Sequence, residues 1–292
     1  MDLSYYPGCT LKTQGKHFER SALAAMSALG VTMKELPRWN CCGASYCLSD
    51  DDLIHQVAPV RNLLRAKEQG DGKLLTLCSF CYNTLKRANL IMKNNAEKRD
   101  TLNRFMDEEI DYGGEIEAVH LLEVLRDDVG WEAIAAKVKK PLRGLTVASY
   151  YGCTLVRPRE IALDDGERPT VLERLMGSLG ASVIDFPLST ECCGSFQGVN
   201  NPEHAAECAW NILGTAARRG AEVIAVTCPL CEYNLGRRQQ DIRLAHSEFK
   251  EMPIVYFTQL LALALGLTPE DCGFELGHTD ARPLLESKGL IA

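Results

Sequence analysis

Short apolar runs and amphipathic stretches alternate along this chain. Four runs have the length and the β-prone composition of buried strands: residues 3–6, 74–77, 145–151 and 223–227. After the first and the third run, apolar residues recur at helical spacing and stop at a glycine: Phe18, Ala22, Ala25 and Leu29 before Gly30, and Leu172, Leu175 and Leu179 before Gly180. In each half of the chain, this pattern therefore predicts a strand, then a helix, and then a second strand further on.

A second helix is predicted in each half, ahead of the second strand. In the first half Asp51 is the expected N-cap, and Pro59 is expected to kink the helix, whose apolar face holds Leu53, Val57, Val60 and Leu64. In the second half Asn201 is the expected cap and Pro202 the first helical residue, ahead of Ala205, Ala209, Ile212 and Ala216. Residues 254–267 form an apolar run that predicts a buried helix, because a membrane span needs about 20 residues.

Strands that alternate with helices of this length predict right-handed βαβ units and parallel sheets. The expected fold is therefore α/β, with two tandem pseudo-symmetric domains, each a small parallel sheet flanked by helices. We assign residues 1–140 and 141–292 to the two domains, with a linker at 141–144, and expect each domain to have its own core. Residues 91–114 are charged, helical in pattern and without a counterpart in the second half, which predicts a lid or docking insertion.

Composition narrows the classes of protein to consider. The chain has 292 residues and a net charge of −7, which argues against a nucleic-acid-binding protein. Its start shows no positively charged or apolar leader, and no run is long enough to span a membrane, so we expect a cytoplasmic protein. Thirteen cysteines are unusual there, because a reducing compartment does not sustain a disulfide framework. Clustered cysteines in such a protein favour metal binding or redox chemistry.

Ten of the cysteines form one pattern written twice. Each copy has a single cysteine, then a Cys-Cys-Gly triplet, then a Cys-x-x-Cys pair. The first copy comprises Cys9, Cys41, Cys42, Cys78 and Cys81, and the second comprises Cys153, Cys192, Cys193, Cys228 and Cys231. All ten fall at or just after predicted strand ends, and the carboxyl ends of parallel strands form one edge of a sheet, where ligands bind. Each half can therefore bring five thiols together.

Five thiols per half exceed what a single-metal site needs. Tetrahedral zinc takes four ligands, and a cubane iron–sulfur cluster also takes four thiolates. The residues alone therefore suggest an iron–sulfur cluster of unusual nuclearity, with a zinc scaffold and a thioredoxin-like dithiol as the less favoured interpretations. Three cysteines lie outside the repeat and are expected to be bystanders or core residues: Cys47, Cys208 and Cys272. The chain also has no nucleotide-binding motif, so electrons for redox chemistry would come from a partner protein.

The doubled cysteine pattern, which fills essentially the whole chain, resembles the B subunit of heterodisulfide reductase in the cysteine-rich CCG-domain family. The resemblance implies two noncubane [4Fe-4S] clusters, each held by the five cysteines of one copy, all of which are present. It also implies a catalytic role, in which a disulfide is reduced to two thiols in one-electron steps between the facing clusters. The implied partners are a ferredoxin-like iron–sulfur subunit, together with a flavin-containing subunit of the same complex.

The identity of the disulfide is the least determined part of this interpretation. In methanogens the family's substrate is the heterodisulfide of coenzyme M and coenzyme B. Both coenzymes are anionic. Four cations that follow the first cysteine of each copy are candidates to steer such an anion: Lys12, Lys16, Arg157 and Arg159. Two alternatives stay open, namely a homologue that acts on protein- or lipoyl-bound sulfur, and a non-catalytic electron-transfer subunit of a dehydrogenase complex.

Overall fold

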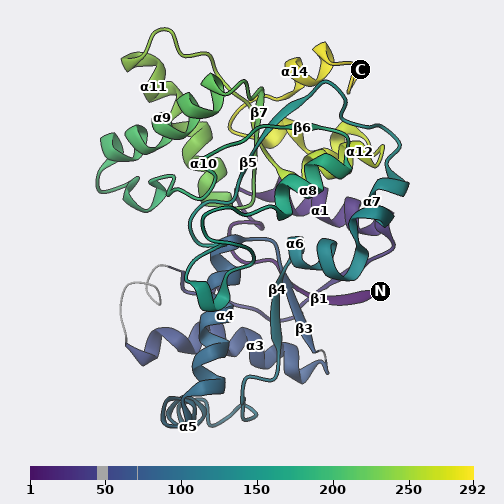
Figure 1. Ribbon diagram of the computed structural model, residues 1–292. Helices are drawn as coiled ribbons and strands as arrows, with labels where there is room; N and C mark the ends of the chain where they lie inside the picture. Colours follow the sequence, from purple (N-terminus) through teal and green to yellow (C-terminus); the bar gives the residue numbers. More distant parts are fainter. Residues whose placement is uncertain (45–51, 71) are drawn as a thin grey trace.

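The computed structural model describes residues 1–44, 52–70 and 72–292, and it contains two parallel sheets (Figure 1). The strands of the first half are β1 (Asp2–Tyr6), β2 (Thr32–Glu35), β3 (Lys73–Thr76) and β4 (Glu117–His120). Those of the second are β5 (Thr146–Tyr150), β6 (Ser182–Val183), β7 (Val223–Val226) and β8 (Ile254–Tyr256). The orders β2-β1-β3-β4 and β6-β5-β7-β8 are equivalent, which confirms the α/β class and the repeat.

Helices connect these strands in the same sequence in both halves. The first half has α1 (Lys16–Leu29), η1 (Leu53–Gln56), α3 (Val57–Glu68), α4 (Ser79–Asn94) and α5 (Ala96–Phe105). A connecting segment follows, with α6 (Leu121–Glu123), η2 (Val124–Val129) and α7 (Trp131–Lys137). The second half has η3 (Arg159–Ile161), α8 (Val171–Ser178), η4 (Ser195–Gln197), α9 (Pro202–Arg218), α10 (Pro229–Arg237), α11 (Gln239–Ala245) and α12 (Phe257–Ala264). It ends with α13 (Pro269–Cys272), η5 (Phe274–Leu276) and α14 (Arg282–Ser287).

The helix boundaries follow the local signals, with two exceptions. Gly30 ends α1 with a φ of 85°, and the Asn201 side chain caps α9 by accepting a hydrogen bond from His204 N at 3.1 Å. Asp51 lies outside the described residues. The helix predicted from Leu53 is divided: Leu53–Gln56 form the 3₁₀ helix η1, and α3 begins at Val57, so Pro59 lies in its first turn, where a missing N–H costs nothing. The predicted helix at 254–267 is also partly wrong, since its first residues form β8.

The segment predicted to be a lid is part of the packed end of the first half. Figure 1 shows α5 at the end of the molecule that lies away from the second sheet. Ion pairs tie the residues after α5 to α3, with Arg61 Nε at 2.6 Å from Glu109 and Lys67 Nζ at 2.6 Å from Glu115. A counterpart also exists, because α11 occupies the same place between α10 and β8. The expectation that this segment has no counterpart is therefore wrong, whereas its role as a lid or docking insertion and the domain boundary at 140/141 stay predictions.

The two halves share one hydrophobic core, contrary to the expectation of separate cores. Buried apolar residues of both sheets belong to one continuous cluster. Helix α1 connects β1 to β2, but it packs against α12 of the second half (Figure 1). The Phe18 ring stacks on the Tyr256 ring with centroids 4.0 Å apart, and Ser21 Oγ lies 2.7 Å from Thr258 Oγ1. Burial of α1 therefore depends on the second half being folded.

The carboxyl ends of the two central strand pairs meet at the interface between the halves. Ser79 follows β3 closely, and its Oγ lies 2.9 Å from both the carbonyl oxygen and Oγ1 of Thr227, which follows β7. Thr227 Oγ1 in turn donates to Tyr151 O, after β5, at 3.0 Å. All of these groups are buried. The two edges at which ligands are expected in parallel sheets thus face each other.

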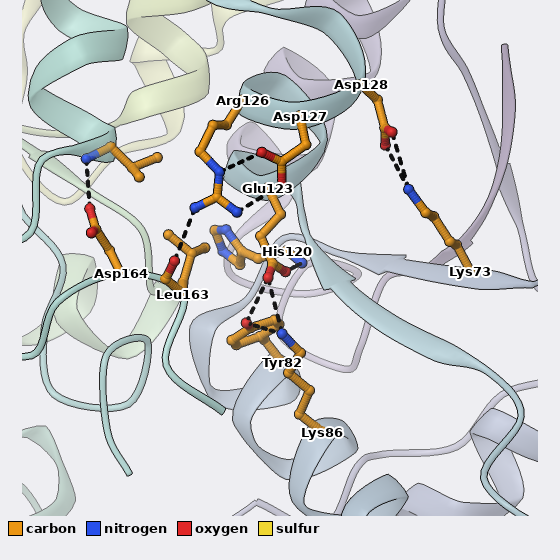
Figure 2. A network of polar contacts seen from close by, with 11 residues as sticks. Lys73, Tyr82, Lys86, His120, Glu123, Arg126, Asp127, Asp128, Leu163 and Asp164 are labelled. Carbon is orange, nitrogen blue, oxygen red and sulfur yellow. Dashed lines mark hydrogen bonds and ion pairs between the residues drawn. The ribbon is translucent and has the colours of Figure 1, made fainter. Parts of the chain in front are cut away.

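A polar network beside this interface connects α4, the segment after β4 and the second half (Figure 2). Glu123 accepts hydrogen bonds from Tyr82 Oη at 3.1 Å and from Lys86 Nζ at 3.0 Å. Arg126 Nη1 donates to Leu163 O at 3.0 Å. These contacts hold α4, which carries the first Cys-x-x-Cys pair, against its neighbours on both sides.

Candidate metal centres

The five cysteines of the first copy lie together at the carboxyl edge of the first sheet. Cys9 follows β1, and Cys78 and Cys81 lie at the start of α4. The Cys9 and Cys41 sulfurs are 3.6 Å apart, as are those of Cys42 and Cys81. Cys81 also interacts with Cys78. The contacts form two groups, Cys9 with Cys41 and Cys81 with Cys42 and Cys78, and cysteines of both groups lie near the Tyr6 hydroxyl.

The second copy repeats this arrangement pair by pair. Cys153 interacts with Cys192, as Cys9 does with Cys41. Cys231 interacts with Cys193 and Cys228, as Cys81 does with Cys42 and Cys78. Exposure also follows the repeat: Cys9, Cys41 and Cys192 are exposed and Cys153 is half-buried, whereas the other members of the two copies are buried.

The two sites meet through one cysteine from each. The side chains of Cys78 and Cys228, which begin the two Cys-x-x-Cys pairs, interact electrostatically with each other across the interface. They stand beside the Ser79–Thr227 contact described above.

Glycines leave room for the sulfurs at equivalent positions. Gly8 has a φ of 74°, and a Cβ there would lie 2.9 Å from Cys81 Sγ. Gly152 has a φ of 67°, and a Cβ there would lie 3.0 Å from Cys231 Sγ. The contact at Gly8 is shorter than real Cβ atoms make, the contact at Gly152 is tighter than most Cβ contacts, and both φ values favour glycine. The backbone therefore passes close to each site only because no side chain is present.

Substituting Gly8 with alanine is expected to disrupt the first site. The added methyl group would displace the Cys81 sulfur, and we expect the variant to bind about half as much iron as the wild type, since one of the two candidate cysteine sites is affected. Gly30→Ala is the matched control, because its φ of 85° imposes similar backbone strain but its Cβ would meet nothing within 4 Å. Iron and labile-sulfide assays on both purified variants check this. Equal iron in the two variants would contradict the assigned role of Gly8.

Two buried tyrosines position the Cys-Cys-Gly loops, and sequence reasoning did not identify them. Tyr6 Oη donates to the carbonyl oxygen of Asn40 at 2.9 Å, and Asn40 directly precedes Cys41. Tyr150 Oη donates to Glu191 O at 2.7 Å, and Glu191 directly precedes Cys192. Burial and the neighbouring thiols raise the pKa of both phenols, so both remain donors. The sequence feature that could have identified these residues is a tyrosine near the end of the first predicted strand in both copies.

The electrostatics of the crowded thiols favour a positively charged group between them. Hydrogen bonds from neighbouring thiols and burial raise the pKa of Cys81 and Cys231, since adjacent thiolates repel each other. A hydrogen bond with Cys153 lowers the pKa of Cys192 to about 6. Full ionisation of five neighbouring thiols therefore requires bound cations, and soft thiolates suit iron–sulfur clusters and zinc.

The geometry fits a cluster better than a single ion. Within the described residues, no group of three or more His, Cys, Asp or Glu side chains is arranged around a single metal ion. The sulfurs instead lie in pairs across a site with five donors, more than the four of tetrahedral zinc. The residues that would hold an iron–sulfur cluster are thus the five cysteines of each copy.

The three remaining cysteines differ in their surroundings. Cys272 is fully buried in the core, as expected. Cys47 lies outside the described residues. The expectation that Cys208 is plain core is wrong, because its side chain is half-buried and its sulfur lies 3.6 Å from His204 Nε2. Close packing against Gly194 also places Cys208 beside the second site, where the repeat-equivalent position in the first half is Ala58.

Only one of the four candidate substrate-binding cations lies beside a cysteine in a pocket. Arg157 lines a pocket of about 450 Å³ together with Cys153. Lys12 forms ion pairs with Glu19 at 2.7 Å and Glu35 at 2.6 Å, which leaves little positive charge for a ligand. Lys16 and Arg159 are exposed and do not line this pocket.

Two cysteine-rich sites at the joined edges of two parallel sheets define a duplicated α/β protein of the iron–sulfur type. A profile of the cysteine-rich CCG domain matches residues 3–86 and 147–236. The chain belongs to this family. Within the described residues, no helix is both long and apolar enough to cross a membrane.

Two relatives of similar length are named as subunits of reductases. The chain is 34% identical to the 8-methylmenaquinol:fumarate reductase membrane anchor subunit of Wolinella succinogenes, over 97% of this chain and 99% of that protein. It is 30% identical to the B subunit of a CoB-CoM heterodisulfide reductase of Methanosarcina acetivorans, over 94% of this chain and 92% of that protein. A hypothetical protein from Helicobacter pylori shares the fold, with a TM-score of 0.76 and 15% identity, and this chain spans 51% of its length. Family and relatives together imply iron–sulfur clusters and redox electron transfer.

Proposed function

We propose that this chain is the catalytic subunit of a heterodisulfide reductase-type complex. The observation that supports the proposal most directly is the interaction between Cys78 and Cys228, which brings one cysteine of each candidate site together at the interface. Reduction of a disulfide needs two electrons, and two equivalent one-electron centres suit a substrate with two sulfur atoms. The overall change is R–S–S–R′ plus two electrons and two protons to RSH and R′SH.

Two noncubane [4Fe-4S] clusters, one in each five-cysteine site, would supply the electrons one at a time. The chain's own residues fix the reaction space. Ser79 and Thr227 close the buried side of the interface by hydrogen bonds. The amide of Asn83 donates to Thr154 O at 2.7 Å and to Arg157 O at 2.6 Å, and so holds the loop after Cys153 against α4. A substrate would therefore meet a preformed interface rather than two independent domains.

The proposed partners supply the electrons. Because the sequence shows no flavin- or nicotinamide-binding motif, electrons would come from a partner protein, which we assign to a ferredoxin-like iron–sulfur subunit, itself fed by a flavin-containing subunit. The relatives named as parts of reductases support an assembly of this kind. The cytoplasmic location predicted from the sequence stays a prediction.

A second candidate is an electron-transfer protein that does not itself act on a disulfide. The observation that favours it is the 34% identity, over nearly the full length of both chains, to a component of a fumarate reductase. In that case the same ten cysteines would hold clusters that pass electrons to or from a partner. The alternative of protein- or lipoyl-bound sulfur as the substrate remains within the first proposal.

Metal analysis and thiol addition distinguish these functions. We expect about eight irons and a similar amount of labile sulfide per chain in anaerobically prepared protein. Addition of a thiol to the oxidised protein should produce a new paramagnetic signal in EPR spectra, because a substrate sulfur would bind at a cluster. Iron with no response to thiols would support the electron-transfer candidate. Zinc in place of iron would overturn both.

A further inference from the structure

Two adjoining hollows form a groove on the outside of the second half. The first, of about 460 Å³, lies between α9 and α11, and the second, of about 830 Å³, continues along α9 to residues 248–253 and α14. Figure 1 shows α9 and α11 beside each other at the outer edge of this half. Trp210 lines both hollows, with its ring stacked on that of His246 at a centroid distance of 4.0 Å. We call the two hollows together the α9 groove.

Helix α9 separates this groove from the second cysteine site. Its inner face packs on the Cys-Cys-Gly loop, because a Cβ on Gly194 would lie 3.0 Å from Ala205 Cα and 2.9 Å from Cys208 Cβ. Residues 203, 206, 207 and 210 line the groove, with the i, i+3, i+4, i+7 spacing of a single helix face. At about 100° per residue this face points away from Cys208. A molecule in the groove therefore lies about one helix diameter, roughly 10–12 Å, from the second site.

The equivalent helix face in the first half is part of the core. An offset of 150 residues relates the two copies, so that Val57 and Val60 correspond to Glu207 and Trp210. Val57 is 8% exposed and Val60 is fully buried. The Glu207 side chain is instead 76% exposed, and Trp210 is half-buried. The second copy thus carries an open, acidic surface where the first has core residues, and the shared fold does not require this difference.

The α9 groove has an apolar floor and an acidic rim. Trp210, Ile242 and Phe249 contribute to the floor. Seven acidic and three basic residues line the two hollows. Among the described residues Glu203 forms no ion pair, and the group nearest to the Glu207 carboxylate that can carry a positive charge is His204 Nδ1 at 3.7 Å. A groove between two helices accepts the apolar face of an amphipathic helix, and an acidic rim selects one with Lys or Arg along its flanks.

We propose that the α9 groove binds a basic amphipathic helix of the partner protein that exchanges electrons with the second site. The proposal rests on the proposed function only in requiring such a partner, and both candidate functions require one. Apolar side chains of the partner would cover Trp210, and its cations would pair with Glu203 and Glu207. The partner would then lie across α9 from the second site, and the interface between the halves would stay free for a substrate.

A pair of synthetic peptides tests the groove. The probe is a fluorescein-labelled amphipathic helix of Leu, Ala and Lys, and its control has Glu in place of every Lys. Fluorescence anisotropy with the cluster-loaded protein should show binding of the Lys peptide alone. Glu203→Lys together with Glu207→Lys should weaken this binding by about tenfold, because two exposed charges are reversed. Glu97→Lys together with Asp100→Lys is the matched control, since both residues are exposed on α5 and the net charge changes equally.

A ruthenium photosensitiser on the Lys peptide tests the exchange of electrons. On illumination each excited Ru(II) centre gives one electron to a cluster and becomes Ru(III), which added EDTA reduces again. Reduction should be slower in Cys193→Ser, which alters the site nearer to the groove, than in Cys42→Ser, which alters the farther one. Equal rates would overturn the assignment of the groove to an electron-exchanging partner.

Other occupants of the groove give different results. Equal binding of the two peptides, or equal weakening by the two double variants, would overturn the basic helix as the ligand. A dimer in sedimentation experiments that only Glu203→Lys with Glu207→Lys dissociates would assign the groove to a second copy of the chain, and binding to phosphatidylglycerol vesicles that this variant alters would assign it to a lipid surface. Either result would overturn the proposal. Peptide binding does not require disulfide turnover, so loss of the proposed reductase function and loss of docking are observed separately.

Discussion

Replacing Cys193 with serine is expected to remove about half of the bound iron and to reduce disulfide turnover by more than about 100-fold. Cys193 is 4% exposed and interacts with Cys231 at the centre of the second site. Serine has nearly the same shape, but its hydroxyl is a poor ligand where a soft thiolate is needed. Changing a residue that only hydrogen-bonds to a metal ligand lowers metal affinity or activity by about 10- to 100-fold. Changing a ligand itself should therefore lower activity further. If both sites act on one disulfide, as proposed above, the loss of one site should abolish most of the turnover.

Cys272→Ser is the control for this substitution. Cys272 is also buried, but it belongs to neither site, so its replacement places a hydroxyl in the core without removing a candidate ligand. We expect this variant to keep its full iron content and its activity. Iron analysis, labile-sulfide analysis and viologen-dependent turnover are compared among the two variants and the wild type. Full iron in Cys193→Ser would refute the ligand assignment, and half iron with full activity would refute the two-site mechanism.

The candidate site was largely predictable from the sequence because spacing alone brings its residues together. A parallel sheet places the ends of its strands at one edge, so cysteines after β1 and β3 must become neighbours once the strands pair. What the spacing does not encode is the way each site is completed. The hydrogen bonds of Tyr6 and Tyr150, the close approach of Gly8 and the proximity of Cys208 depend on the paths of loops between strands.

The central strands were predictable, whereas the outer strands were not. Runs at β1, β3, β5 and β7 are apolar because both faces of a central strand are covered by helices. At the edge, β2 has one buried residue, Met33, among Thr32, Lys34 and Glu35, and β6 has only two residues. Such short, polar strands carry no periodic signal. For β8 the difficulty is the reverse, since an apolar run that continues into α12 cannot be divided into strand and helix by hydrophobicity alone.

The position of α1 was the main feature of the fold that the repeat could not reveal. The spacing of Phe18, Ala22, Ala25 and Leu29 correctly predicts a helix with one buried face. An amphipathic pattern does not say which surface covers that face. A duplicated sequence suggests that each half buries the apolar face of its own helix. Here α1 of the first half instead packs on α12 of the second half.

Phe18→Ala is therefore expected to destabilise both halves together. The ring is fully buried, stacked on Tyr256 and at 5.7 Å from the Phe257 ring centroid, so its removal should cost about 3–5 kcal/mol in the free energy of unfolding. Because the core runs through both sheets, urea unfolding followed by circular dichroism and tryptophan fluorescence should show one transition, shifted to lower urea. Phe105→Ala is the matched control, since Phe105 is 59% exposed and should change stability little. Two separate transitions, only one of which moves, would show that α1 does not couple the halves.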